Sequence, residues 1–229
     1  MIAGWSTYSL KDFLLFGPET YWRLFALENQ DQWPVALVTL AAGLGLVAAL
    51  VRGWQPSGRL IGPLAGLIWL WVGWQFVFQR YGPINWVAED LSILFYTQGL
   101  LLAGLGISGK LRLFRTGERH AKAASAVLFA IALAIYPLLA VFDGRTWQTA
   151  QVFGVAPDPT VVATLGLLVL APRRWPAAIL QIAPALWLGI SAMTLLAMDA
   201  WQGWFTLSVW LAGFTAWLAI PARMRGPTP

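Results

Sequence analysis

The 229-residue chain is too apolar for an ordinary soluble protein, since 59% of its residues are hydrophobic and only 11% are charged. Soluble domains carry about 25% charged residues, so the composition indicates an integral membrane protein. The net charge of +5 could suggest nucleic-acid binding, but the basic residues lie in short stretches between apolar segments, as topology signals do. Without cysteine, the chain has no disulfide, thiolate metal site, thiol catalysis or covalently attached c-type haem.

Residues 1–33 are predicted to form an amphipathic segment at the membrane surface, not a signal peptide. They lack a basic start and a continuous apolar core, and four acids interrupt them. Two short helices are expected, over residues 9–16 and 18–29, with Trp22, Leu24 and Phe25 resting on lipid in the second. A lid over the mouth of a cavity is the alternative that the same pattern allows.

The rest of the chain is predicted to be an all-α, polytopic bundle of about seven transmembrane helices, residues 34–221, followed by a short cytoplasmic tail, residues 222–229. The expected spans are residues 34–51, 60–78, 91–107, 123–142, 159–171, 176–198 and 204–220. Eleven Lys and Arg residues fall on one side of these spans and four on the other. By the positive-inside rule the C-terminus is cytoplasmic and the N-terminus lies outside, in a bacterial inner membrane.

The fifth span is short, and an acid between two prolines precedes it. A helix from Pro159 to Pro172 would reach roughly 20 Å, while the hydrocarbon core is ~30 Å thick. Either the bilayer thins there, or residues 152–158 enter the membrane as non-helical backbone, which is tolerated only inside protein or along a wet cavity. Pro159 suits the first helical position, and Asp158 is predicted to cap the helix.

Several kinds of site are excluded. No Asp, Glu, Lys, Arg or His lies inside the expected spans, which disfavours a side-chain proton pathway. The only histidine, His120, lies in a basic stretch, so a haem held by two histidines of one chain is excluded, and no lysine in the third, fifth or seventh span could carry a retinal Schiff base. No catalytic Ser/His/Asp set, metal-ligand spacing or phosphate-binding loop is present. We therefore identify no cofactor or metal site and expect no enzyme, although outer acids could serve a lipid-modifying hydrolase.

Residues able to bind a solute gather near the outer ends of the spans. Carboxylates at the mouth of a bundle concentrate cations, and aromatic rings beside them could form a box for a cation or an apolar cofactor. Outward-facing acids, interfacial tryptophans and hydrogen bonds between helices also explain such residues without a binding role. The candidate substrate-binding residues are Asp158, Thr160, Glu89, Asp90, Trp69, Gln75, Tyr96, Gln98 and Asp199.

A faint internal repeat relates the first three spans to the last three. Trp54 precedes Pro63 by nine residues, and Trp175 precedes Pro184 by nine. This spacing predicts a parallel 3+1+3 arrangement of helices, of the kind seen in some secondary transporters.

Residues 153–160, FGVAPDPT, and residues 164–168, TLGLL, resemble the signature of DUF6064, a family of bacterial membrane proteins of unknown function. The likeness covers most of the chain and includes the Pro-Ile-Asn turn at residues 83–85 and Tyr136-Pro137. Members of the family are often labelled permeases, so the resemblance implies a permease as an expectation.

Two functions remain open. The first is a small-solute permease with an outer vestibule of acids and aromatic rings. The second is a non-catalytic accessory subunit of a larger membrane complex, or a subunit that binds a lipid or cofactor. The expected partners are the lipid bilayer and either a membrane-complex partner or further copies of the chain, and not nucleic acid.

Overall fold

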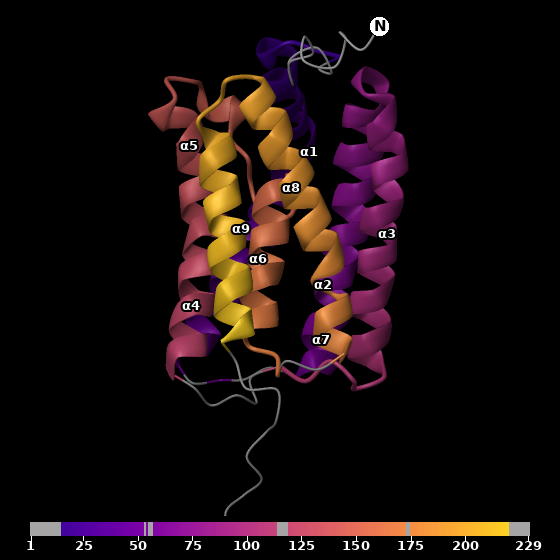
Figure 1. Cartoon of the computed structure of the whole chain (residues 1–229), viewed down its shortest axis with the longest axis vertical. Helices are drawn as coiled ribbons and strands as arrows, with labels where there is room; N and C mark the ends of the chain where they lie inside the picture. Colours follow the sequence, from indigo (N-terminus) through magenta and orange to yellow (C-terminus); the bar gives the residue numbers. More distant parts are fainter. Residues whose placement is uncertain (1–14, 53, 55–56, 114–118, 173–174, 220–229) are drawn as a thin grey trace, which may run out of the picture.

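In the computed structural model, which describes residues 15–52, 54, 57–113, 119–172 and 175–219, the chain is a bundle of helices (Figure 1). A helix or a run of helical pieces occupies each of the seven expected ranges. The elements are α1 (Pro18–Val51), α2 (Gly58–Val72), the π-helix η3 (Gly73–Tyr81), the 3-10 helix η4 (Gly82–Ile84), α3 (Trp86–Ile107), α4 (Arg119–Ala130), the π-helix η5 (Ile131–Ile135), α5 (Tyr136–Phe142), the 3-10 helix η6 (Trp147–Thr149), α6 (Pro157–Val169), α7 (Trp175–Ile179), α8 (Ile182–Ala197) and α9 (Gln202–Leu218).

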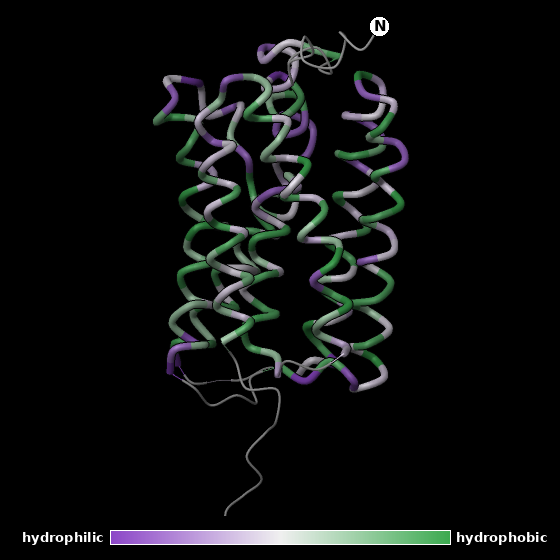
Figure 2. The backbone as a smooth tube through the Cα atoms, viewed as in Figure 1, coloured by the Kyte–Doolittle hydropathy of each residue, from purple (hydrophilic) through white to green (hydrophobic). Residues whose placement is uncertain are grey.

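The surface of the bundle confirms a membrane protein. Within the described residues, five helical segments are long and apolar enough to cross a bilayer, while α6 is shorter. Figure 2 shows hydrophobic residues along the middle of the bundle and hydrophilic residues gathered toward its two ends. Large apolar side chains are exposed around the outside, as a lipid environment favours. They include Leu37, Leu44, Leu67, Leu100, Val127, Met193 and Leu211.

Helix α6 is the centre of the bundle. All of its residues are buried, and it contacts α4, η5, α8, α9 and α2. Figure 1 shows it enclosed in the lower part of the bundle, with α4, α5 and α9 on one side and the α2–α3 pair on the other. A helix of 13 residues cannot span the hydrocarbon core. Its neighbours therefore provide the apolar surface that meets lipid.

Helices α2 and α3 touch backbone to backbone along a glycine seam. A Cβ added at Gly62 would lie 2.7 Å from both the Gly106 Cα and the Leu102 carbonyl oxygen, and one added at Gly66 would lie 2.5 Å from the Gly99 carbonyl oxygen. Small residues at such spacings allow membrane helices to approach closely and pack by van der Waals contact. The seam therefore holds α2 and α3 together as a hairpin.

The amphipathic segment is part of α1 and not a separate helix. Helix α1 runs on through a kink at Gln32, two residues before Pro34, and only the last two residues of the expected helix 9–16 are described. The prediction that Leu24 and Phe25 rest on lipid is wrong. They are 6% and 2% exposed, and Phe25 stacks on Phe76 of η3 with ring centroids 4.8 Å apart. Phe76 of η3 provides the apolar partner that the sequence pattern does not show.

The internal repeat is not reflected in how its matched helices pack. Helix α1 lies at the periphery, where only 11% of its most apolar stretch is buried, whereas its counterpart α6 is enclosed. Pro34 and Pro159 therefore stand in different surroundings, and the 3+1+3 arrangement stays a prediction.

A single methyl group in the glycine seam should destabilise the bundle. In Gly106→Ala the new Cβ would lie 2.8 Å from Gly58 O and Gly62 Cα, and we expect the free energy of unfolding to fall by about 1–3 kcal/mol because the helices must separate. Denaturation in mixed detergent micelles measures it. The matched control is Gly104→Ala on the same helix, where nothing lies within 4 Å of the added Cβ. An equal loss in both variants would contradict close packing as the cause.

Candidate functional site

The chain enters the centre of the bundle as non-helical backbone before α6 begins. After η6, residues 150–156 descend from one end of the bundle to the start of α6 (Figure 1). Gly154, Val155 and Ala156 are buried, and Phe153 and Ala156 form an isolated bridge. Of the two alternatives for the short fifth span, the structure thus shows the one in which this segment enters the bundle and is buried in protein.

Two threonines supply the hydrogen bonds that this buried backbone needs. The Thr160 hydroxyl donates to the Ala156 carbonyl oxygen at 2.7 Å and accepts from the Gly154 N–H at 2.9 Å. From α1, the Thr39 hydroxyl lies 2.8 Å from the Phe153 carbonyl oxygen, to which it donates. Unpaired backbone groups at membrane depth cost several kcal/mol each. Thr160 is therefore a structural residue of the turn that leads into α6.

Gly154 cannot be replaced without strain. Its φ is +83°, a conformation that residues with a side chain rarely adopt. A Cβ at this position would also lie 2.3 Å from the Thr39 Cβ. Helix α1 thus touches the backbone of the turn directly.

Asp158 lies inside the bundle and not at its mouth. The prediction that it caps the helix is wrong: α6 begins at Pro157, its N-cap is Ala156, and no side chain bonds to the cap. The Asp158 side chain instead accepts hydrogen bonds from Trp187 Nε1 at 2.8 Å and from Ser191 Oγ at 2.7 Å, both on α8. Asp158 is 2% exposed. We call Asp158, Trp187 and Ser191 the Asp158 site.

Aromatic rings surround the Asp158 site. Phe95 of α3 packs edge-on against Trp187 with ring centroids 4.8 Å apart and contacts Trp69 of α2 at 4.7 Å. The buried phenols of Tyr21, Tyr81 and Tyr136 also lie close enough to interact electrostatically with the carboxyl. These rings come from elements spread over most of the chain and enclose one acid.

The Asp158 carboxyl forms no ion pair with Lys, Arg or His in the part of the chain that the structure describes. A lone carboxylate is very costly in a low-dielectric interior, so such a group is stable when protonated or when a cation lies beside it. The site is therefore chemically suited to hold a proton or a positively charged group. Among the described residues, no cluster of three or more His, Cys, Asp or Glu side chains could ligate a metal.

Of the other predicted site residues, Trp69 belongs to the rings around this site, and the donors to Asp158 are Trp187 and Ser191 instead. Trp69 is buried, but its Nε1 donates to Thr164 Oγ1 at 2.8 Å, and the Gln98 amide donates to the Leu180 carbonyl oxygen at 2.9 Å. These bonds join helices, which is the structural role that the sequence also allowed. Tyr96 and Gln75 are partly buried, whereas the three remaining acids are exposed. These acids are Glu89, Asp90 and Asp199.

A cover, which we call the outer cover after the orientation that the sequence predicts, closes the end of the bundle above the Asp158 site. We define it as residues 18–31 of α1 together with residues 143–150. The Asn29 side chain joins the two parts by donating to the carbonyl oxygens of Gln148 and Ala150, at 2.8 and 2.7 Å. Arg80 of η3 donates to Glu28 at 3.0 Å and also pairs with Asp31. Polar contacts thus fasten the cover to the ends of neighbouring helices.

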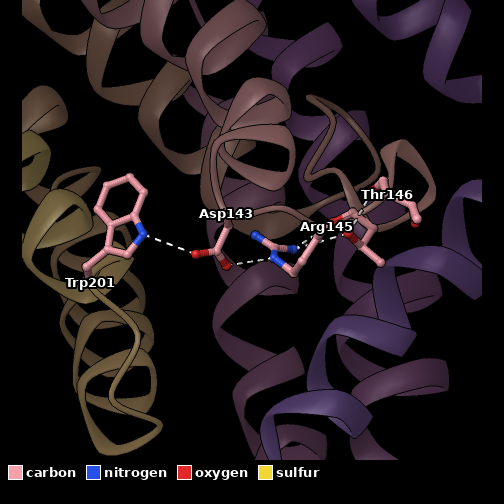
Figure 3. A network of polar contacts seen from close by, with 5 residues as sticks. Asp143, Arg145, Thr146 and Trp201 are labelled. Atoms are coloured by element: carbon pink, nitrogen blue, oxygen red, sulfur yellow. Dashed lines mark hydrogen bonds and ion pairs between the residues drawn. The ribbon is translucent and has the colours of Figure 1, made fainter.

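A second polar network joins residues 143–150 of the cover to Trp22 of α1 and to Trp201 (Figure 3). Arg145 donates to Asp143 at 2.9 Å, and Trp201 donates to the same carboxylate at 3.2 Å. The Arg145 guanidinium also lies 3.6 Å from the ring centroid of Trp22 on α1. Partial burial alone would raise the pKa of Asp143, but the hydrogen bonds from Arg145 and Trp201 outweigh it and lower that pKa below its usual value.

Sequence reasoning missed the two partners of Asp158 on α8. Neither Trp187 nor Ser191 is among the candidate residues named from the sequence. A signal was present, because residues four apart on a helix share a face, and a tryptophan and a serine at that spacing present two donors to the same neighbour. The acid that they would meet could not be identified without the path of residues 150–156.

The comparisons with known proteins identify a family and no function. The model of a family of unknown function, DUF6064, matches residues 18–220. No curated protein and no solved structure matches the chain. The resemblance to DUF6064 that residues 153–160 indicate is therefore confirmed, and it extends over most of the chain.

Removing one donor to Asp158 should destabilise the folded protein. Ser191→Ala leaves one oxygen of a buried carboxyl unpaired, so we expect a loss of about 1–3 kcal/mol in the free energy of unfolding. Ser208→Ala on α9 is the matched control, because Ser208 is exposed and bonds to its own helix at the Trp204 carbonyl. It should change the free energy by less than about 0.5 kcal/mol. The free energies of unfolding are measured by a detergent denaturation titration, and equal values for the two variants would argue against a stabilising Ser191–Asp158 bond.

Acid should loosen the outer cover. Because folding lowers the Asp143 pKa, its stabilisation is complete above about pH 4, the ordinary pKa of Asp, and is lost as the pH falls through the lower pKa of the folded protein. Hydrogen exchange of residues 143–150, corrected for the intrinsic effect of pH, should therefore rise below about pH 4 while that of α3 does not. In Asp143→Asn the hydrogen exchange of residues 143–150 should be raised already at neutral pH. If exchange in the unmodified protein does not change with pH, the Asp143 network does not stabilise the cover.

Proposed function

Since the chain belongs to the DUF6064 family of unknown function, its activity has to be inferred from its structure, and we propose that it is a small-solute permease. The solute we infer carries a positive charge and binds at Asp158. In this proposal all seven helical stretches form the membrane domain, including the short α6, with the N-terminus outside and the C-terminus in the cytoplasm.

The observation that carries the proposal is the buried Asp158 carboxyl at the start of a broken helix. Discontinuous helices that begin within the bundle, preceded by buried irregular backbone, form the central sites of many secondary transporters. Residues 150–156 and α6 have this form. Acids at such depth are costly, and they usually belong to a substrate or ion pathway.

The surroundings of Asp158 suit a small cation. A carboxylate offers charge-assisted hydrogen bonds to an ammonium group, and the rings of Trp187 and Phe95 offer aromatic faces and edges close to it. The Tyr136 hydroxyl, 3.3 Å from the Thr206 hydroxyl, adds a further polar group from the opposite side of the bundle. A neutral solute would leave the charge of an ionised Asp158 uncompensated.

The outer cover would serve as the outer gate. It holds Tyr21 and Phe25 against Phe76 and Tyr81 of η3, with the Tyr21 and Tyr81 ring centroids 6.1 Å apart. A few hydrogen bonds, from Asn29, Arg80 and Arg145, hold it in place, and water molecules can replace them. The π-helices η3 and η5 lie beside this region, and π-helical turns within α-helices occur frequently at functional sites.

The proposed orientation agrees with how the basic residues are paired. At the end that bears the cover, Arg80 pairs with Glu28 and Asp31 and Arg145 pairs with Asp143, while Arg23 is exposed. At the opposite end several basic side chains are exposed, as expected on a cytoplasmic face. They are Arg52, Arg59, Lys110, Arg112, Arg119 and Lys122.

Uptake into proteoliposomes tests the proposal. Labelled methylammonium, ethanolamine, choline and putrescine serve as probes, and a trapped dye reports proton movement. Asp158→Asn keeps the shape of the side chain but removes its charge, and we expect transport to fall about tenfold or more. Asp90→Asn, the same change at an exposed acid of α3 that does not join the Asp158 site, should transport normally. Transport unchanged by Asp158→Asn, or no flux above that of empty liposomes, would refute the assignment.

The second candidate is a non-catalytic accessory or lipid-binding subunit. It is favoured by the exposed apolar surface of α1 and by an apolar groove of about 560 Å³ between α1 and the α4–α5 region, lined by Trp33, Leu37 and Pro137 among others. Transport assays and an analysis of the molecules retained by the same purified protein distinguish the two candidates. A protein that transports none of the probes and retains a quinone, pigment or protein subunit after gentle extraction would support the second.

A further inference from the structure

A basic pocket lies at the end of the bundle opposite the outer cover. It has a volume of about 290 Å³, close to the lower limit of about 300 Å³ for small-molecule sites. Lys110 and Arg112 line it on one side, and Pro172 and Trp175 line it on the other. The Lys110 ammonium group lies 5.8 Å from the centroid of the Trp175 ring. The pocket thus combines two cations with an aromatic and apolar wall.

The fold fixes the backbone that carries the two basic side chains. Gly109, in the turn after α3, has a φ of +69°, and the Leu111 N–H donates to the Leu105 carbonyl oxygen at 2.9 Å. Beyond this turn, side chains alternate, with Leu111 and Leu113 buried and Lys110 and Arg112 exposed. The Leu111 carbonyl packs so closely on Gly58 that a Cβ there would overlap it. The cations therefore project from a backbone that is fixed on both sides.

The charge of the pocket has no compensation from its own walls. No acid is among the described residues that line it. Arg59 adds a third positive group nearby, because its guanidinium would lie 3.1–3.2 Å from a Cβ built on Gly109. Like charges repel one another, so the cluster favours binding of an anion from outside.

We propose that this pocket binds the phosphodiester headgroup of an anionic membrane phospholipid. The pocket lies where α3, α6 and α7 reach the end of the bundle, at the level at which headgroups meet a membrane protein (Figure 1). Basic pockets between membrane helices bind such headgroups. The walls formed by Leu111, Pro172 and Pro176 are apolar and suit the glycerol and first acyl carbons, which free phosphate lacks. This site is separate from the Asp158 site and independent of permease activity.

Native mass spectrometry of the full chain in detergent tests the proposal. Dioleoyl phosphatidylglycerol and dioleoyl phosphatidylcholine are added in turn, and the fraction of protein retaining each lipid is measured. Each basic group near an anionic lipid contributes about fivefold to affinity, so Lys110→Gln with Arg112→Gln should weaken phosphatidylglycerol binding by about 25-fold. Lys122→Gln, an exposed cation at the same end of the bundle that does not line the pocket, should bind as the unmodified protein does.

The remaining outcomes are distinct. Equal retention of the two lipids, or equal retention by the double variant and the unmodified protein, would overturn the proposal. Displacement of phosphatidylglycerol by millimolar inorganic phosphate would show a free-anion site and overturn the lipid assignment. A salt titration of the unmodified protein needs no variant: retention should fall steeply as ionic strength rises, and retention independent of salt would count against the proposal.

Discussion

The structure depends on one requirement, that irregular backbone inside a bilayer must find its hydrogen bonds within the protein. Residues 150–156 enter the bundle without forming a helix, and Thr160 and Thr39 supply bonds that a helix would otherwise provide. This is why α6 begins deep in the bundle and why its neighbours surround it completely. It is also why α1 approaches the turn so closely at Gly154.

The same path places an acid where the bilayer would not otherwise permit one. Asp158 follows the buried segment by two residues and meets Trp187 and Ser191 of α8, which neutralise none of its charge. The outer cover then separates this carboxyl from water at the near end of the bundle. An enclosed acid, a broken helix and a cover fastened by a few polar contacts are mutually consistent with a solute site that opens in turn to each side.

The sequence predicted the class, the approximate positions of the apolar helical segments and the unusual character of residues 153–160, because apolar length and proline position are local properties. It did not predict that residues 18–33 continue into the first of these segments as one helix. It also named Asp158 as a candidate. It did not predict the depth of Asp158, since that follows from the path of the preceding segment, nor its partners on α8, which are distant in sequence. Glu89, Asp90 and Asp199 were grouped with it because all four acids stand near ends of apolar segments. Only tertiary structure separates the buried acid from the exposed ones.

The glycine seam limits how the bundle can rearrange. With Gly62, Gly66, Gly99 and Gly106 allowing direct backbone contact, α2 and α3 have no layer of side chains between them that could slide or repack. They must therefore move as a rigid body, carrying Trp69 and Phe95 together. Helix α1 has few buried side chains along its apolar stretch and is kinked at Gln32. Any change that exposes Asp158 is consequently expected to displace α1 or α8 relative to a rigid α2–α3 hairpin.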